Sequence, residues 1–148
     1  MKLKKIVLLL IPFLLCSAFV SDETKTITWD SISHVSYVRM FSPQNGAFYD
    51  KPIFSRDISA LNQKRVKLTG YIIPIDATGE RYFLSANPNS SCFFCGKGEK
   101  HQVMELKLKN LPANYKMDEY LTFEGVFSTH TDMFLYFPYS LENATLVK

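Results

Sequence analysis

The sequence predicts a mostly β protein of the α+β class: a small OB-like Greek-key barrel with a short helical and looped N-terminal arm. Three observations favour this fold. Several segments in the second half alternate apolar and polar side chains, with the period of two that half-buried strands show. Aromatic residues are abundant, at 14% of the chain, and their bulk suits a small barrel core. Gly70 lies inside the clearest strand, where the buried face changes.

The barrel is expected over residues 65–148. Its first strand, Arg65 to Ile75, is apolar on one face up to Gly70 and on both faces beyond it. This pattern predicts a bulge or sharp bend that lets one strand serve both sheets of the barrel. Residues 76–80 are typical of a hairpin loop. The later strands are expected at residues 81–85, 101–109 and 120–127, and then as one strand or a pair, interrupted near Pro138, at 134–139 and 144–147.

The arm is expected over residues 27–64. Apolar side chains that recur every third residue predict a short helix; they are Trp29, Ile32, Val35 and Val38. Ser55 is placed to cap a second short helix that contains Ile58 and Leu61. Residues 42–52 contain Pro, Asn-Gly and Lys-Pro signals and are expected to form a long loop. We expect this arm to pack its aromatic side chains across the barrel.

The N-terminus has the organisation of a secretory signal peptide. Three lysines precede a run without charge over residues 6–20, and the small residues Cys16 and Ala18 provide a cleavage site. We therefore expect a signal peptide at residues 1–18, a linker at 19–26 and a single OB-like domain at 27–148. The expected location is the periplasm or cell envelope. The alternative is a lipoprotein anchored at Cys16, although Leu15 occupies the position where a lipobox has a small residue.

Removing the signal peptide changes the net charge. The chain has 17 Lys and Arg against 14 Asp and Glu, and three of the lysines lie in the export segment. The mature protein would therefore carry equal numbers of both signs. Neutrality argues against nucleic acid as a partner, and membrane contact is expected only if Cys16 is lipidated.

The segment Cys92-Phe93-Phe94-Cys95-Gly96 carries the chemistry of the chain, and the sequence leaves three interpretations open. The first is a site for zinc or copper, since two thiolates and an imidazole suit these ions. Its ligands would be Cys92, Cys95 and His101, with Glu99 or His130 as an extra ligand and His34 or Asp132 as other donors. The second is a structural Cys92–Cys95 disulfide in an oxidising compartment.

The third interpretation is thiol–disulfide chemistry at the same pair. Reactive pairs of this spacing usually gain a lowered thiol pKa from a helix N-terminus or a nearby cation. The following Gly-Lys-Gly does not resemble a helix start, but Lys97 and Lys100 are close in sequence. No hydrolase, kinase or dinucleotide-binding motif is present, which argues against a conventional enzyme.

The chain resembles an uncharacterised family of bacterial exported proteins and lipoproteins, known as a domain of unknown function. The matching features are Trp29, Pro52-Ile53-Phe54, Leu61, the strand Val66 to Asp76 with its Gly-Tyr-Ile-Ile-Pro-Ile-Asp stretch, the Cys-Phe-Phe-Cys-Gly loop, and Val103-Met104-Glu105. The resemblance covers about residues 27 to 147. It implies an OB-like fold and members that accompany ABC-type permeases linked to metal uptake. It also implies that some relatives keep only the first cysteine, here Cys92.

These observations predict an envelope binding or accessory module that handles zinc or copper beside an envelope transporter. The first alternative is a structural adaptor whose disulfide only stiffens a loop. The second is a thiol–disulfide oxidoreductase. In each case the expected macromolecular partner is an envelope transporter or another envelope protein.

Overall fold

The computed structural model describes residues 23–111, 113–132 and 137–147. The export segment expected at residues 1–18, and residues 134–136 of the strand expected at 134–139, lie outside this range. No helix among the described residues is long and apolar enough to cross a membrane.

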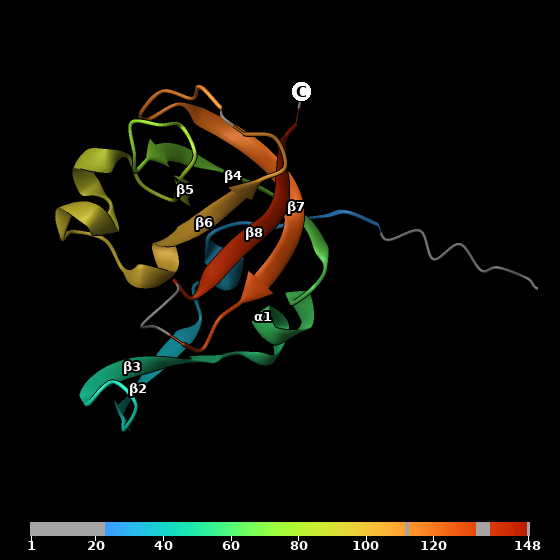
Figure 1. Cartoon of the computed structure of the whole chain (residues 1–148). Coiled ribbons are helices and arrows are strands. Elements are labelled where there is room, and N and C mark those ends of the chain that lie inside the picture. Colours follow the sequence, from blue (N-terminus) through green and yellow to red (C-terminus); the bar gives the residue numbers. More distant parts are fainter. Residues whose placement is uncertain (1–22, 112, 133–136, 148) are drawn as a thin grey trace, which may run out of the picture.

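The elements follow one another from a short first strand to a long last one (Figure 1). They are β1 (Lys25–Thr26), η1 (Asp30–Ile32), β2 (Val35–Ser42), β3 (Ala47–Phe54), α1 (Arg56–Leu61), β4 (Arg65–Pro74), β5 (Tyr82–Ser85), η2 (Asn89–Ser91), η3 (Phe93–Cys95), η4 (Lys100–Gln102), β6 (Val103–Leu108), β7 (Tyr120–Thr129) and β8 (Tyr139–Leu146), where η denotes a 3₁₀ turn.

Five of these strands close a barrel. Their order is β4-β5-β6-β8-β7, and β7 pairs again with β4. All pairings are antiparallel except the parallel pair β6–β8. Strand β4 makes the closure, because it pairs with β7 over Arg65–Tyr71 and with β5 over Tyr71–Pro74. The structure thus confirms the mostly β class and the small OB-like barrel.

The barrel interior holds the main core. It is built from the side chains that alternate inward along the strands, closed at one end by α1 and by residues of the arm. Its largest fully buried members are Tyr82, Tyr139, Phe123, Phe127, Ile32, Ile58, Leu68, Ile72, Leu84, Met104 and Leu141. The inward positions expected for Met104, Leu106 and Leu108 are confirmed. Helix α1 begins as expected, since the Ser55 side chain accepts a hydrogen bond from the Ile58 amide.

The N-terminal arm differs from the expectation. The helix expected over residues 29–38 is limited to η1, and the long loop expected over 42–52 is wrong. Strands β2 and β3 instead form an antiparallel hairpin with Val35 opposite Phe54 and Ser42 opposite Ala47. The β-branched and aromatic side chains of this segment favour a strand over a helix. The Asn45-Gly46 pair supplies the turn, with Gly46 at a φ of +62°.

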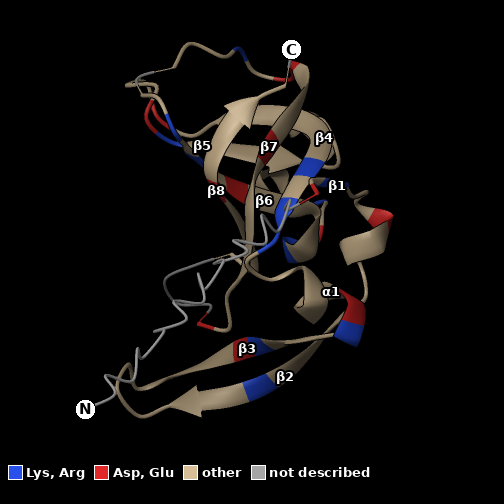
Figure 2. Cartoon of the chain, turned by 90° about the vertical axis from the view of Figure 1, so that its right-hand side faces the viewer, with Lys and Arg blue, Asp and Glu red and all other residues tan. Residues whose placement is uncertain are grey.

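The hairpin projects below the barrel in both views (Figures 1 and 2). The arm packs its aromatic side chains on the barrel only in part. Trp29 and Phe54 contact the main core, whereas Phe41 and Phe48, near the tip, pack against each other with ring centroids 5.1 Å apart and remain exposed.

Gly70 has a different role from the expected bulge. Strand β4 keeps its register through Gly70, which pairs with Leu121. A Cβ atom at this position would meet the Ser85 carbonyl oxygen at 2.6 Å and the Leu84 side chain at 2.9 Å. The indole of Trp29, which donates a hydrogen bond to the Thr69 carbonyl, also lies close. The register shifts of the barrel lie in β8 instead, where Asn143 has a φ of +51° and both neighbours, β6 and β7, change register beside it.

Replacing Gly70 with alanine should lower the free energy of unfolding by about 1–3 kcal/mol, because a methyl group must push against a backbone carbonyl in a packed wall. Gly46→Ala is the matched control. It has no atom within 4 Å of its Cβ position, so only its positive φ should cost stability, by about 1 kcal/mol. Urea denaturation of both variants measures the difference. A smaller loss at Gly70 than at Gly46 would contradict the close-approach explanation.

Candidate functional site

The cysteine loop covers the outside of the barrel between β5 and β6. Ile73, Phe83 and Val103 point outward from β4, β5 and β6, and form a second core with Cys92. Phe93 and Phe137 pack against this cluster, and the rings of Phe83 and Phe137 lie 4.8 Å apart. The apolar groups that the sequence places on both faces of β4 beyond Gly70 therefore have a partner on each side.

The two thiols lie in different environments. Cys92 is 1% exposed within the second core, whereas Cys95 is exposed, and both are free. Both sulfur atoms face Asn89. The Cys95 thiol donates to the Asn89 carbonyl oxygen at 2.8 Å, and the Cys92 thiol lies 3.8 Å from the Asn89 side-chain oxygen. The disulfide considered from the sequence is not formed in this structure, and Asn89 is a contact that the cysteine spacing did not indicate.

The backbone of the loop folds tightly around Cys92. Its carbonyl oxygen faces three amides, those of Cys95 at 3.2 Å, Gly98 at 3.3 Å and Lys97 at 3.4 Å. Gly96 allows the turn with a φ of +71°. A Cβ atom on Gly98 would lie 2.7 Å from the Phe93 amide nitrogen, so the returning chain lies directly against the Cys92–Phe93 backbone. Gly96 and Gly98 thus let the loop fold around the backbone of Cys92.

The other expected metal ligands are not brought to the cysteines. Among the described residues, no group of three or more His, Cys, Asp or Glu side chains could hold a metal ion. Glu99 and Gln102 form a reciprocal capping box around η4, which fixes His101 on this turn. The Nδ1 atom of His101 is buried without a hydrogen-bond partner. Burial lowers the pKa of His101, and the nearby Glu99 charge opposes this effect.

His130, directly after β7, belongs to a separate network with residues of β6 and β8. Its Nε2 atom lies 2.8 Å from the Ser140 hydroxyl, which donates to Glu142 at 2.6 Å. Lys107 forms an ion pair with Glu142 at 3.0 Å. Burial, followed by the positive charge of Lys107, lowers the pKa of His130. His34, considered as a metal donor, is exposed between η1 and β2.

The hairpin meets the end of the cysteine loop along one seam. Lys100 lies 4.0 Å from Asp50 of β3, and the hydroxyl of Tyr37 in β2 is buried without a hydrogen-bond partner. Burial raises the pKa of Tyr37 to about 12, with smaller contributions from Glu99 and Asp50. The sequence does not predict this contact, because its Pro, Asn-Gly and Lys-Pro signals indicate a loop over residues 42–52. The Asn45-Gly46 turn between two apolar runs was the signal for a hairpin.

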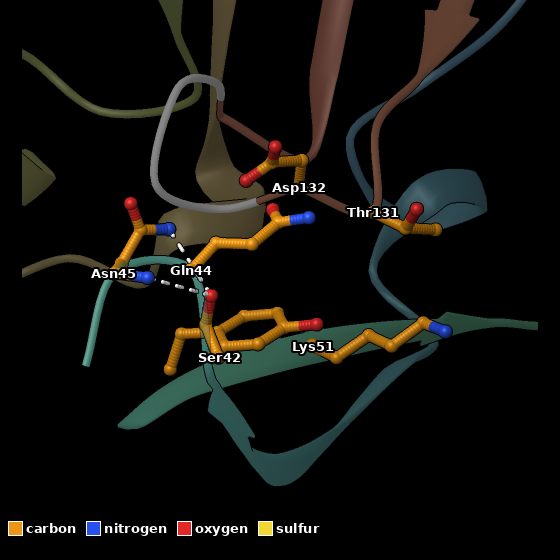
Figure 3. A pocket seen from close by; sticks show the side chains of 7 residues that line it. Ser42, Gln44, Asn45, Lys51, Thr131 and Asp132 are labelled. Carbon is orange, nitrogen blue, oxygen red and sulfur yellow. Dashed lines mark hydrogen bonds between the residues drawn. The ribbon is translucent and has the colours of Figure 1, made fainter. Parts of the chain in front are cut away.

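A small polar pocket lies on the other side of the hairpin, beside Thr131 and Asp132 (Figure 3). Its volume is about 180 Å³, and its walls are Ser42, Gln44, Asn45, Tyr49, Lys51, Thr131 and Asp132. Asn45 donates from its amide and its side chain to the Ser42 hydroxyl, at 3.4 and 3.2 Å. Asp132, considered as a metal donor, lies in this pocket and not with the cysteines.

The partly buried histidines His101 and His130 should make the fold sensitive to acid. Because the pKa of His101 is lowered in the folded state, the unfolded chain binds more protons below about pH 6.5, and stability falls as the pH drops through that region. His101→Phe removes this titration and the unpaired Nδ1 atom. Urea unfolding measured between about pH 5 and 7 should show a shallower loss of stability in this variant than in the wild type. An equal slope would contradict the role of His101.

Comparison with known proteins supports the fold expectation. No family model matches the sequence, and no curated protein matches it. Among solved structures, the crystal structure of a DUF3299 family protein from Pseudomonas aeruginosa PAO1 is similar. The TM-score is 0.50 at 16% sequence identity, over 84% of this chain and 97% of the other. The chain thus shares its overall fold with a protein from a domain-of-unknown-function family.

Proposed function

We propose that this protein is an accessory module of the bacterial cell envelope that binds another envelope protein through its β2–β3 hairpin. The observation that carries the proposal is the exposure of large apolar side chains on the hairpin. The exposed fractions are Val38 50%, Met40 40%, Phe41 52%, Phe48 62% and Ile53 48%. The envelope location rests on the export segment predicted at residues 1–18.

Both faces of the hairpin contribute to this surface. Cross-strand neighbours share a face, so Phe41 and Phe48 lie on one face, and Val38 and Met40 lie on the other. Only three of residues 35–54 are charged, namely Arg39, Asp50 and Lys51 (Figure 2). Arg39 lies 5.4 Å above the Phe48 ring and covers part of it. Apolar groups concentrated on a projecting element are typical of interaction surfaces.

The edge of β2 defines the class of partner. Among the described residues, β2 pairs only with β3, so one edge of an eight-residue strand has unpaired backbone groups. Strand β3 contains Pro52 and two charged residues, features that oppose strand addition. Strand β2 has no proline and one charge. We therefore expect the partner to supply an extended apolar segment that pairs with β2 and covers both faces of the hairpin.

Site-specific photo-crosslinking in the native host's envelope tests this docking. A photoreactive residue at Phe48 should give an adduct with one defined envelope protein, identified by mass spectrometry. Leu111 is the matched control, because it is 48% exposed but lies away from the hairpin. The Phe41→Ser change should abolish the adduct while lowering the free energy of unfolding by no more than about 1 kcal/mol, since Phe41 is half exposed and loses mainly its ring contact with Phe48. The same adducts from positions 48 and 111, or no adduct at position 48, would refute the proposal.

Metal handling is the second candidate, favoured by the convergence of two thiols on Asn89. Two sulfur donors suit copper or zinc, with other ligands supplied by solvent or by a partner. Reduced protein exposed to either ion should then retain about one equivalent after desalting, and Cys92→Ala should retain none. His101→Ala should retain as much as the wild type, because the structure does not group His101 with the cysteines. Elemental analysis measures all three proteins, and equal metal in wild type and Cys92→Ala would exclude the pair as the site.

A further inference from the structure

The cysteine pair takes no part in the proposed docking, and its geometry indicates an activity of its own. The Cys95 amide donates to the Cys92 carbonyl at 3.2 Å, which closes a turn between residues three apart. Such a turn holds its end Cα atoms less than about 7 Å apart, and a disulfide spans about 4.4–6.8 Å between Cα atoms. Both sulfur atoms already contact Asn89. Rotation of the two side chains can therefore bring the sulfurs together while the turn is kept.

The different burial of the two thiols assigns them different roles. Cys95 is exposed and can be approached by another molecule. Cys92 is 1% exposed: Gly98 lies against its backbone, and Phe93 packs against the second core to which its side chain belongs. A reagent too large to enter the second core can reach only Cys95. This difference in accessibility is the physical basis for assigning Cys95 as the attacking thiol and Cys92 as the resolving thiol.

We propose that Cys92 and Cys95 form a reversible thiol–disulfide exchange site, with Cys95 reacting first and Cys92 resolving. The substrate class is a small or surface-exposed disulfide. The Cys95 sulfur bonds to one sulfur of that disulfide, the substrate S–S bond breaks, and the departing sulfur takes up a proton. The Cys92 sulfur then attacks Cys95 and releases the second substrate thiol with the other proton. The substrate disulfide is reduced to two thiols, and the pair is oxidised to one disulfide.

The packing of Cys92 favours the reduced form of the cysteine pair over the oxidised form. In the reduced form the Cys92 side chain fills a place between Ile73, Phe83 and Val103, and bond formation must draw its sulfur toward Cys95. The oxidised form therefore loses contacts that the reduced form has, so the oxidised pair is readily reduced by an external thiol, and an excess of substrate disulfide drives the exchange in the direction written above. A purely structural disulfide would be expected to show the opposite preference.

Reaction of the reduced, chelator-treated full-length protein with excess glutathione disulfide tests the site, with intact mass as the readout and with Cys16 replaced by serine in every protein, including the reference called wild type here, so that only Cys92 and Cys95 can react. The wild type should form an intramolecular disulfide and show little accumulated glutathione adduct, and dithiothreitol should reverse the change. Cys92→Ala removes the resolving thiol without placing a polar group in the second core, and it should accumulate one glutathione adduct on Cys95. Cys95→Ser should react at least about tenfold more slowly, because a buried thiol reacts only when its loop opens.

A further variant tests whether Cys92 reacts slowly because it is buried or because its thiol is intrinsically unreactive. Gly98→Ala forces a Cβ atom against the Phe93 amide and should loosen the cover of Cys92. Added to Cys95→Ser, it should restore reaction with glutathione disulfide at Cys92. Thermal unfolding of each variant verifies that it is folded. Cys95→Ser reacting as fast as Cys92→Ala, a wild type that keeps a stable glutathione adduct, or a wild type that does not react would each overturn the proposal. None of these outcomes bears on docking by the hairpin.

Discussion

The pairing of β4 with both β5 and β7 is the constraint on which the rest of the structure depends. A ten-residue strand closes the barrel only if it can change partners along its length, and β4 does so at Tyr71. Gly70 makes this change compatible with dense packing, because the Ser85 carbonyl and the Trp29 indole occupy the space that a side chain would need. The hydrogen bond from Trp29 to Thr69 then attaches the arm to the same point of the barrel wall.

The second core follows from this closure. Once β4 runs past its partner β7, its outward-facing Ile73 needs cover, as do Phe83 and Val103 on the neighbouring strands. The cysteine loop provides the cover by burying Cys92 and packing Phe93. Cys92 therefore serves first as a small apolar side chain of the fold. Cys95, outside the core, is not needed for packing.

Periodicity predicted the barrel well and the arm poorly, for a physical reason. Each barrel strand has one face in a common core, so residues such as Met104, Leu106 and Leu108 alternate cleanly. The hairpin has no such core, because its apolar side chains lie on both faces and are largely exposed. Its sequence therefore lacks a single buried face, and the chance recurrence of apolar residues from Trp29 to Val38 imitated a helix. The Asn45-Gly46 turn was the more reliable local signal.

The candidate metal site shows that the spacing of possible ligands in the sequence does not by itself predict that they meet in the structure. The five residues between Cys95 and His101 are enough to let the chain return an imidazole to the thiols, but the length of the segment does not determine the direction in which the chain runs. The direction of the chain after Cys95 is set by backbone contacts that cannot be read from the sequence. Gly98 lies against the Cys92–Phe93 backbone, and the Ala86 amide donates a hydrogen bond to the Gln102 carbonyl at 2.9 Å. The capping box of Glu99 and Gln102 then commits η4 to the start of β6. With His101 held on that turn, the chemistry of the loop is that of two thiols in unequal environments.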